Sequence, residues 1–318
     1  MKKIIVTGAA GFIGFHLSKF LANNKFDVLG IDSLNNYYDV NLKIQRKKIL
    51  EEFPNFSFEH TDLCDYSKLK NIFTKFNPNF VVNLAAQAGV RYSQINPRAY
   101  LDSNLVGFFN VLQLSEEMKV QKLIYASSSS VYGSNKKIPF EESDLTDQPI
   151  SLYAASKKSN ELLAANFSHN SNIPSVGLRF FTVYGPYGRP DMAYYSFAEK
   201  INENQEITVF NNGKMSRDMT YIDDIINGIF ESIHFYQNPG EHEIFNLGNN
   251  SPVELWTLIK FLEDKLQKKA KINFLEASTE VQITFANIDK SCKMLNFKPS
   301  TSFEQGMNQF IDWYINKK

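Results

Sequence analysis

The sequence predicts an α/β fold: a doubly wound parallel sheet with a smaller C-terminal α/β domain interleaved with it. Three observations predict this fold. Short β-rich runs alternate with longer helical patterns over the first 181 residues, a glycine-rich turn joins the first run to the first helix, and the regular alternation loosens after residue 181. A chain of 318 residues is long enough for one or two domains with a sizeable core.

Six runs rich in β-branched and aromatic residues predict the strands of the sheet. They cover residues 2–8, 26–32, 56–62, 79–86, 121–128 and 176–181. Apolar residues at helical spacing predict the helices between them, at residues 12–23, 40–53, 66–76, 97–118 and 152–170. Pro97 suits the first turn of the fourth helix. In the second helix, Lys43, Arg46, Lys47 and Lys48 are expected to form a solvent-exposed face.

The pattern changes in the last third of the chain. Residues 182–193 (TVYGPYGRPDMA) are dense in glycine and proline and predict a loop. Further helices are expected at residues 194–202, 222–236, 252–268 and 303–315, and a strand at 245–249. We therefore expect one domain from residues 1–181 with 221–247, and a second from residues 182–220 with 248–318.

Charge and cysteine content exclude several classes of protein. Lys plus Arg and Asp plus Glu both total 34, which removes any bulk electrostatic case for nucleic acid or an acidic membrane as the partner. No apolar run approaches the ~20 residues of a membrane span, and the glycines near the N-terminus favour a folded first strand over a signal peptide. Cys64 and Cys292 form no disulfide framework, and the five histidines lack metal-ligand spacing. These features predict a cytosolic, soluble enzyme without a metal.

The segment GAAGFIG places Gly8, Gly11 and Gly14 after the first strand and at the opening of the first helix. The first glycine permits a tight turn, the second permits close approach of a diphosphate, and the third lets helix and strand pack closely. Asp32 ends the second strand, about 20 residues further on, where a carboxylate binds both ribose hydroxyls and repels a 2′-phosphate. The pattern predicts a Rossmann-type domain that prefers NAD to NADP; its alternative is a tight turn that binds no ligand.

A second motif suits proton transfer. The segment SLYAASKKSNE places Tyr153 and Lys157 four residues apart, on one face of a helix. Tyrosine has a free pKa near ~10, so it is a poor base at neutral pH unless a cation such as Lys157 or oxidised nicotinamide stabilises the phenolate. Ser128 lies at the carboxyl edge of the sheet, where ligands bind in such folds. Together the three residues predict hydride-transfer chemistry, whereas the Tyr and Lys alone would also fit an exposed helical pair.

With its GxxGxxG spacing and these three residues, the chain resembles the extended short-chain dehydrogenase/reductase family. The resemblance implies catalytic roles for Ser128, Tyr153 and Lys157, and a tightly bound NAD that is regenerated in each turnover. It implies that NAD is bound by Gly8, Gly11, Phe12, Ile13, Gly14, Asp32, Asp62, Leu63, Leu84, Ala85, Ala86, Tyr153 and Lys157. The small residues at 84–86 would also fit ordinary sheet core.

Within that family the chain is most similar to the UDP-glucuronate 4-epimerases, which are NAD-dependent nucleotide-sugar epimerases. The similarity lies in NNYYDVNLK, AAQAGVRYS, SLYAASKKSNE, RFFTVYGPYGRPDMA and SRDMTYIDD, of which YGPYGRPDMA is the most discriminating segment. The resemblance implies conversion of UDP-glucuronate to UDP-galacturonate, with an NAD-binding first domain and a nucleotide-sugar-binding second domain.

The same resemblance implies that the substrate is bound by Ser128, Ser129, Ser130, Thr182, Arg189, Val209, Phe210 and Arg217. Arg217, in a loop ahead of a helix, is expected to bind the diphosphate, and Val209 with Phe210 to pack on uracil. Arg189 is expected to bind the sugar carboxylate with Thr182 and the two serines that follow Ser128. Simpler alternatives are an ion pair of Arg217 with a neighbouring aspartate, core packing for residues 209–210, and a purely structural Arg189.

In the implied mechanism Tyr153 takes the proton of the 4-hydroxyl while the hydride of carbon 4 passes to NAD. Ser128 hydrogen-bonds the same oxygen, the 4-keto sugar turns over, and the hydride returns to its opposite face. The intermediate is a β-keto acid, which loses carbon dioxide most readily when the breaking bond aligns with the carbonyl π system. A carboxylate held by Arg189 is kept out of that alignment.

Several alternatives stay open. Ser129 and Ser130 stand where dehydratases of the family carry Asp and Glu, which argues against elimination of water. UDP-glucuronate decarboxylases, UDP-glucose-type 4-epimerases and a non-catalytic NAD-binding regulator remain. The chain also departs from its relatives at residues 279–281, where Thr-Glu-Val replaces Gly-Asp-Val. The resemblance further implies a homodimer through the helices at 97–118 and 152–170, a cytoplasmic location and a role in polysaccharide biosynthesis.

Overall fold

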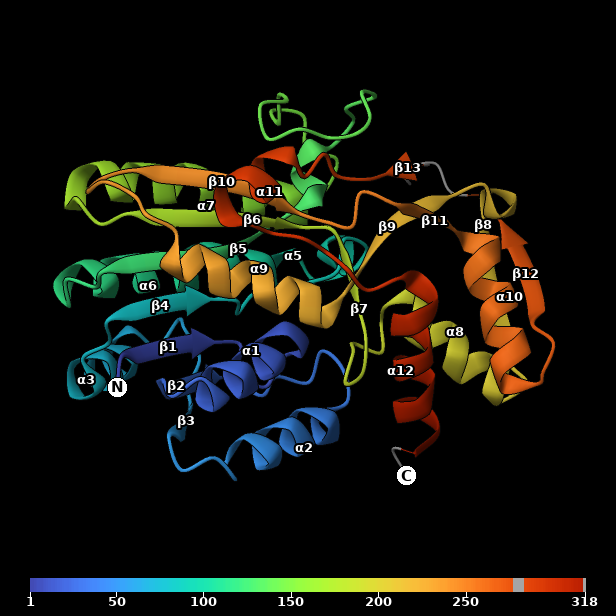
Figure 1. Cartoon of the computed structure of the whole chain (residues 1–318), viewed down its shortest axis with the longest axis horizontal. Helices are drawn as coiled ribbons and strands as arrows, with labels where there is room; N and C mark the ends of the chain where they lie inside the picture. Colours follow the sequence, from blue (N-terminus) through green and yellow to red (C-terminus); the bar gives the residue numbers. More distant parts are fainter. Residues whose placement is uncertain (277–282, 317–318) are drawn as a thin grey trace.

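The computed structural model describes residues 1–276 and 283–316. Among these residues, a seven-stranded sheet has the order β10-β6-β5-β4-β1-β2-β3, and each neighbouring pair is parallel (Figure 1). Its strands are β1 (Lys3–Thr7), β2 (Asp27–Asp32), β3 (Phe56–His60), β4 (Phe80–Asn83), β5 (Lys122–Ser128), β6 (Ser175–Phe180) and β10 (His242–Leu247). The predicted doubly wound, Rossmann-type fold is confirmed.

Helices cover both faces of the sheet because side chains alternate along each strand. In β1, Ile4 and Val6 belong to one core cluster and Ile5 to the other. The first cluster includes residues of α1 (Phe12–Asn23) and α9 (Ile222–His234). The second includes residues of α3 (Tyr66–Phe76), α6 (Gly107–Glu117) and α7 (Leu152–Ser171). The carboxyl ends of the strands are thereby left uncovered by these helices.

A smaller α/β region lies beyond those carboxyl ends (Figure 1). Strand β9 (Ser216–Tyr221) pairs with β7 (Thr182–Tyr184), β11 (Pro252–Glu254) and β13 (Ile283–Thr284), while β8 (Glu206–Phe210) pairs with β12 (Lys271–Leu275). The accompanying helices are α8 (Ala193–Asn202), α10 (Leu255–Leu266) and α12 (Phe303–Asn316), whereas α11 (Asp289–Leu295) packs on β10 and α9 of the large sheet. One core cluster runs from β1 into this region, so the two parts share their apolar interior.

Three predicted elements differ from the structure. The predicted loop at 182–193 begins with β7, because Thr182–Tyr184 pair with the distant strand β9. The predicted helix at 252–268 starts at Leu255, because the preceding three residues pair with the same strand as β11. The predicted helix at 97–118 consists of α5 (Pro97–Tyr100), a π-helical segment η1 (Leu101–Val106) and α6. Local composition shows neither long-range pairing nor a widened helical turn.

The expected solvent-exposed face of helix α2 (Val40–Leu50) was wrong for two of its four cations. Lys48 is exposed, but Lys43 and Arg46 are 4% and 0% exposed. The spacing of three residues places both on the inward face of the helix. There, Lys43 Nζ donates to the carbonyl and side-chain oxygens of Asn35, both at 2.7 Å.

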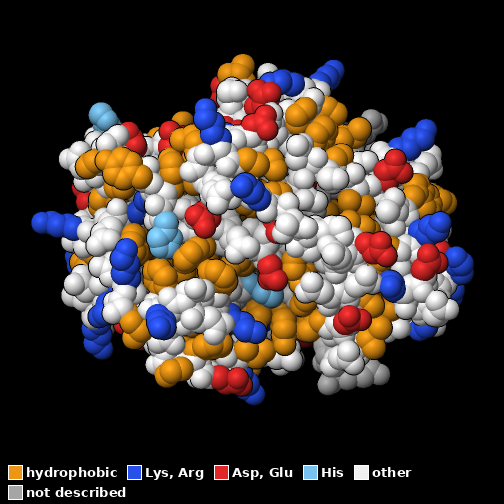
Figure 2. Space-filling model, in the orientation of Figure 1, with side chains coloured by type: hydrophobic (Ala, Val, Ile, Leu, Met, Phe, Trp, Pro, Cys, Tyr) orange, Lys and Arg blue, Asp and Glu red, His pale blue; other side chains and the backbone are white. Residues whose placement is uncertain are grey.

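The surface bears out the balanced charge of the chain. On the face seen in Figure 2, basic and acidic side chains are interspersed. Within residues 1–276 and 283–316, no helix has the length and apolarity needed to cross a bilayer. The same described residues contain no cluster of three or more His, Cys, Asp or Glu side chains suited to a metal ion.

Candidate active site

A cavity of about 860 Å³ lies at the carboxyl ends of the large sheet and extends toward the smaller region. In folds of this kind ligands bind at that edge. The predicted site residues that line the cavity are Gly8, Gly11, Phe12, Ile13, Gly14, Asp32, Asp62, Leu63, Leu84, Ala85, Ala86, Ser128, Ser129, Ser130, Tyr153, Lys157, Thr182, Arg189 and Arg217. Residues from nine separate segments of the chain thus converge on one cavity.

The glycine turn forms one end of the cavity. Gly8 has a φ of +72°, and a Cβ there would lie 2.8 Å from the backbone nitrogen of Ala85. A Cβ on Gly14 would lie 2.0 Å from the carbonyl oxygen of Gly8. The turn is therefore closed to side chains, and α1 begins at Phe12 with no side-chain cap on its free N–H groups. Such a helix start suits a diphosphate.

Asp32 stands beside this turn at the end of β2. One carboxylate oxygen accepts a hydrogen bond from the backbone N–H of Ala10 at 3.1 Å, and the other accepts one from Leu34 at 2.8 Å. These two bonds fix the carboxylate at the cavity wall, where further lone pairs remain for ligand hydroxyls. The arrangement fits the ribose of NAD.

Ser128 and Tyr153 meet across the middle of the cavity. Ser128 ends β5, and its Oγ accepts a hydrogen bond from the backbone N–H of Ser130 at 3.1 Å. Ser151 caps α7 by accepting from the N–H of Ala154 at 3.1 Å, which sets Tyr153 in the first turn of that helix. Burial raises the pKa of Tyr153, while a hydrogen bond with Ser128 and the charge of Arg189 act in the opposite direction.

Lys157 lies one helical turn further along α7. It is 3% exposed, and its Nζ donates to the carbonyl oxygen of Ala126 at 2.8 Å. Burial lowers its pKa to about 8. The ammonium is therefore held by the strand that carries Ser128, on the same helix as the tyrosine that it is predicted to assist.

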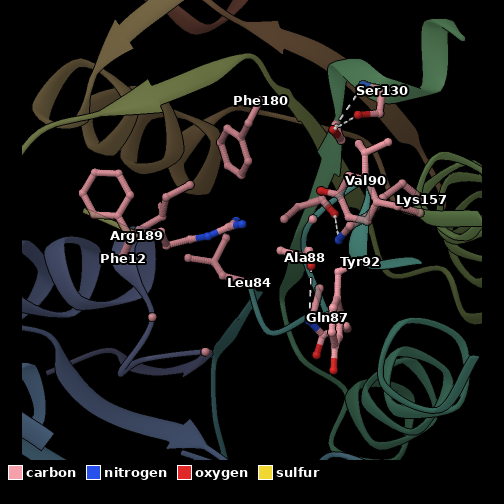
Figure 3. Close-up of a pocket in the computed structure, with 18 of the residues that line it drawn as sticks. Phe12, Leu84, Gln87, Ala88, Val90, Tyr92, Ser130, Lys157, Phe180 and Arg189 are labelled. Atoms are coloured by element: carbon pink, nitrogen blue, oxygen red, sulfur yellow. Dashed lines mark hydrogen bonds between the residues drawn. The ribbon is translucent and has the colours of Figure 1, made fainter. Parts of the chain in front are cut away.

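Arg189 enters the cavity from the loop between β7 and α8. In Figure 3 its guanidinium lies close to Leu84 and Phe180, while Lys157 and Ser130 lie on the other side of the pocket. Arg189 Nε and one Nη donate to the two carboxylate oxygens of Asp191 at 3.0 and 2.5 Å. Tyr37 donates its hydroxyl to the same carboxylate at 3.1 Å. The carboxylate of Asp191 therefore holds the guanidinium of Arg189 in one orientation.

Three predicted substrate contacts need a different description. Val209 is 0% exposed within β8 and Phe210 follows it, and neither lines the described cavity. The guanidinium of Arg91, which does line the cavity, lies 4.2 Å from the ring centroid of Phe210. Arg217 lines the cavity from strand β9 rather than from a loop. The predicted departure at residues 279–281 lies outside the described residues.

The prediction missed several polar residues around the site. Asn104, in η1, accepts from the N–H of Gln87 at 2.7 Å and donates to the carbonyl of Gln87 and to Ser156 Oγ at 3.1 and 3.0 Å. It thereby joins the loop after β4 to the helix of Tyr153. Asp191 and Tyr37 were also missed. The proximity of Asp191 to Arg189 in the sequence is a usable signal, but the contacts of Asn104 depend on the π-helical segment.

The sequence between residues 4 and 248 matches the model of the NAD dependent epimerase/dehydratase family. The chain belongs to this family. Protein CapI of Staphylococcus aureus is 47% identical, over 98% of both chains. UDP-glucuronate 4-epimerase 4 of Arabidopsis thaliana is 42% identical, over 98% of this chain and 75% of the plant protein.

Solved structures of enzymes that act on nucleotide sugars are similar to this member of the epimerase/dehydratase family. UDP-glucuronic acid 4-epimerase of Bacillus cereus, in complex with UDP-glucuronic acid and NAD, is 34% identical with a TM-score of 0.93, over 99% of this chain and 100% of that one. The predicted family and the NAD cofactor are confirmed. The glycine turn and the fixed carboxylate of Asp32 agree with that cofactor.

Proposed function

We propose that the protein converts UDP-glucuronate to UDP-galacturonate by NAD-dependent epimerisation at carbon 4, through a transient 4-keto sugar. The observation that carries the proposal is the convergence of Tyr153, Lys157 and the serines at 128–130 with Arg189 in one cavity. Tyr153, Lys157 and the serines suit proton transfer, and Arg189 is a cation suited to binding a sugar carboxylate. The resemblance to enzymes that act on UDP-glucuronate supports the same substrate.

The glycine turn would hold the diphosphate of NAD and Asp32 its ribose. When bound, NAD supplies the hydride acceptor and donor for carbon 4. Tyr153 takes the proton of the 4-hydroxyl, and Ser128 donates a hydrogen bond to the same oxygen. The hydrogen bond with Ser128 and the charge of Arg189 oppose the effect of burial on the pKa of Tyr153, and Lys157 is the further cation proposed to stabilise the phenolate. After the sugar turns over, Tyr153 returns the proton.

The carboxylate of the sugar is proposed to bind Arg189, Thr182, Ser129 and Ser130. All four line the cavity. A guanidinium carries five N–H donors, of which the pairing with Asp191 uses two. Held in one orientation, the carboxylate of the 4-keto intermediate stays out of alignment with the carbonyl π system. This restraint favours epimerisation over loss of carbon dioxide.

The proposal is tested by incubating the purified protein with UDP-glucuronate and NAD, then separating the products by chromatography and mass spectrometry. A product of unchanged mass that co-elutes with UDP-galacturonate is expected. A product lighter by carbon dioxide would identify a decarboxylase. Turnover of UDP-glucose alone would identify a neutral-sugar epimerase, and absence of turnover with every UDP-sugar would leave a cofactor-binding regulator.

We also propose that the chain forms two domains that bind different ligands. Residues 1–181 with 221–247 form the NAD-binding domain, and residues 182–220 with 248–318 form the nucleotide-sugar-binding domain. The division is supported by the sheets: the large sheet draws its strands from the first set, whereas β7, β8, β11, β12 and β13 belong to the second. Strand β9 ends at Tyr221, next to the proposed boundary.

A homodimer is the proposed assembly. Val106 at the end of η1 is 49% exposed, Phe109 in the first turn of α6 is 53% exposed, and Leu162 on α7 is 62% exposed. Helices α6 and α7 pack against each other, so their exposed apolar side chains supply a face for a second copy. We further propose that the enzyme works in the cytoplasm and that its product, an activated sugar acid, feeds polysaccharide biosynthesis.

A further inference from the structure

Arg46 is a buried cation whose partners lie in two different ligand-binding segments. Its side chain on α2 is 0% exposed. One terminal nitrogen donates to the carbonyl oxygen of Ala10 at 2.8 Å and to the hydroxyl of Tyr38 at 2.6 Å. The other donates to the carbonyl oxygens of Tyr187 and Gly188 at 2.7 and 3.0 Å. Ala10 belongs to the glycine turn, and Gly188 directly precedes Arg189.

The segment before Arg189 has further contacts with the NAD side of the molecule. His16 of α1 hydrogen-bonds the carbonyl oxygen of Pro186 through Nε2 at 2.9 Å. Burial lowers the pKa of His16 to about 4, so this ring is a neutral donor at physiological pH. Tyr187 has a φ of +55°, and its ring lies 5.0 Å from that of Phe15. The backbone that carries Arg189 is therefore fixed to α1 and α2.

The chemistry of Arg46 suits a link between two segments. A guanidinium is planar and presents donors at two ends, whereas a lysine ammonium is a single point of charge. Arg46 uses one end for the glycine turn and the other for the Arg189 loop. Its Nε is buried without a hydrogen-bond partner in the described part of the chain.

We propose that Arg46 is a positioning residue that sets Arg189 relative to the glycine turn. Arg46 touches neither ligand in this scheme; it acts through the backbone at 187–188. The inference rests on the proposed function, because it assigns Arg189 the carboxylate of the sugar. Its consequence is specific: a change at Arg46 weakens binding of the uronate group and leaves binding of the UDP group nearly intact.

The test is a double-mutant cycle with Arg46→Lys, Arg189→Met and the two combined, all as NAD-loaded protein. Calorimetry measures the dissociation constants of UDP-glucuronate and of UDP, which lacks the sugar acid. Arg46→Lys is expected to weaken UDP-glucuronate binding about five- to tenfold and UDP binding less than about twofold. In the Arg189→Met background the effect on UDP-glucuronate should vanish, because the residue through which Arg46 acts is absent.

An equal loss in both backgrounds, or an equal loss for UDP, would overturn the inference and leave Arg46 a structural residue. Lys47→Met is the matched control, since Lys47 lies on the same helix with a partly exposed side chain paired to Glu51. Lys47→Met should change neither the dissociation constant of UDP-glucuronate nor that of UDP. If Arg46→Lys lowers the melting temperature too far for calorimetry, Tyr38→Phe removes one partner of the guanidinium and enters the same cycle.

The proposed function and the positioning role of Arg46 can be refuted independently. Wild-type protein that neither binds nor turns over UDP-glucuronate would refute that function. Wild-type protein that does both, with additive effects of Arg46→Lys and Arg189→Met, would refute only the positioning role.

Discussion

At the scale of single residues, burial opposes the chemistry proposed for Tyr153 and Lys157. Burial raises the pKa of the phenol that must lose a proton and lowers the pKa of the ammonium that should help it, to about 8. The charge of Arg189 acts in favour of the phenolate. Arg189 therefore has two proposed tasks, carboxylate binding and electrostatic support of the base.

This second task predicts a pH shift in the variant Arg189→Met. Removing the positive charge raises the pKa of Tyr153, so the basic form of the tyrosine is populated only at higher pH. The acidic limb of the kcat/KM profile should therefore move to higher pH. Arg98→Met is the control, because Arg98 is exposed and paired with Asp102 on the surface. An unmoved acidic limb would contradict the electrostatic role.

Sequence could predict the residues whose chemistry follows from a local motif. The glycine turn, Asp32, Ser128, Tyr153 and Lys157 all line the cavity as expected. Arg46 was predicted on a solvent-exposed face, because its neighbours in sequence are charged and two of its partners, Tyr187 and Gly188, lie over 140 positions away. Contacts of that range depend on tertiary structure, which no local pattern encodes.

At the scale of elements, α7 is joined to the sheet by a buried ion pair. Arg179 of β6 donates to both carboxylate oxygens of Glu161 at 2.8 and 2.9 Å. Ser127 donates to the same carboxylate at 2.6 Å, one residue before Ser128. The helix of Tyr153 and the strand of Ser128 are thereby held in register. The pair connects the two elements whose residues must meet in the cavity.

Glu161→Gln leaves the buried guanidinium of Arg179 without its counter-charge. The free energy of unfolding, measured with denaturant, should fall by roughly 3–5 kcal/mol. The double variant Glu161→Gln/Arg179→Met removes the uncompensated charge and should recover part of that loss. Glu117→Gln, at the surface, should leave stability unchanged. A double variant no more stable than the single one would argue against an uncompensated charge as the cause.

The periodicity of the sequence predicted the helices and strands well in the first half of the chain and less well in the second half. The six strands predicted up to residue 181 all occur in the large sheet. Short strands such as β7 and β11 were missed, because three residues carry too little pattern and their pairing with β9 spans tens of residues. The π-helical segment η1 was also missed, because the polar contacts of its Asn104 are with residues outside the segment.

At the scale of the whole molecule, the proposed homodimer gives a direct prediction. Phe109→Asp places a charge in the exposed apolar face of α6 and α7 and should reduce the sedimenting species from twice the mass of one chain to that of a single chain. Tyr236→Asp is the matched control, because Tyr236 is 80% exposed but lies outside these helices. Wild-type protein that sediments as a monomer would refute the assembly.

The position of β10 in the large sheet bears on how the chain is made. Strand β6, buried along its whole length, pairs with β10 on one side, yet β10 is formed by residues 242–247. During synthesis β6 leaves the ribosome more than sixty residues before that neighbour, and until then its backbone is an unprotected edge. Fragments that end before His242 should therefore aggregate rather than fold. The large sheet is completed only after much of the second region has been translated.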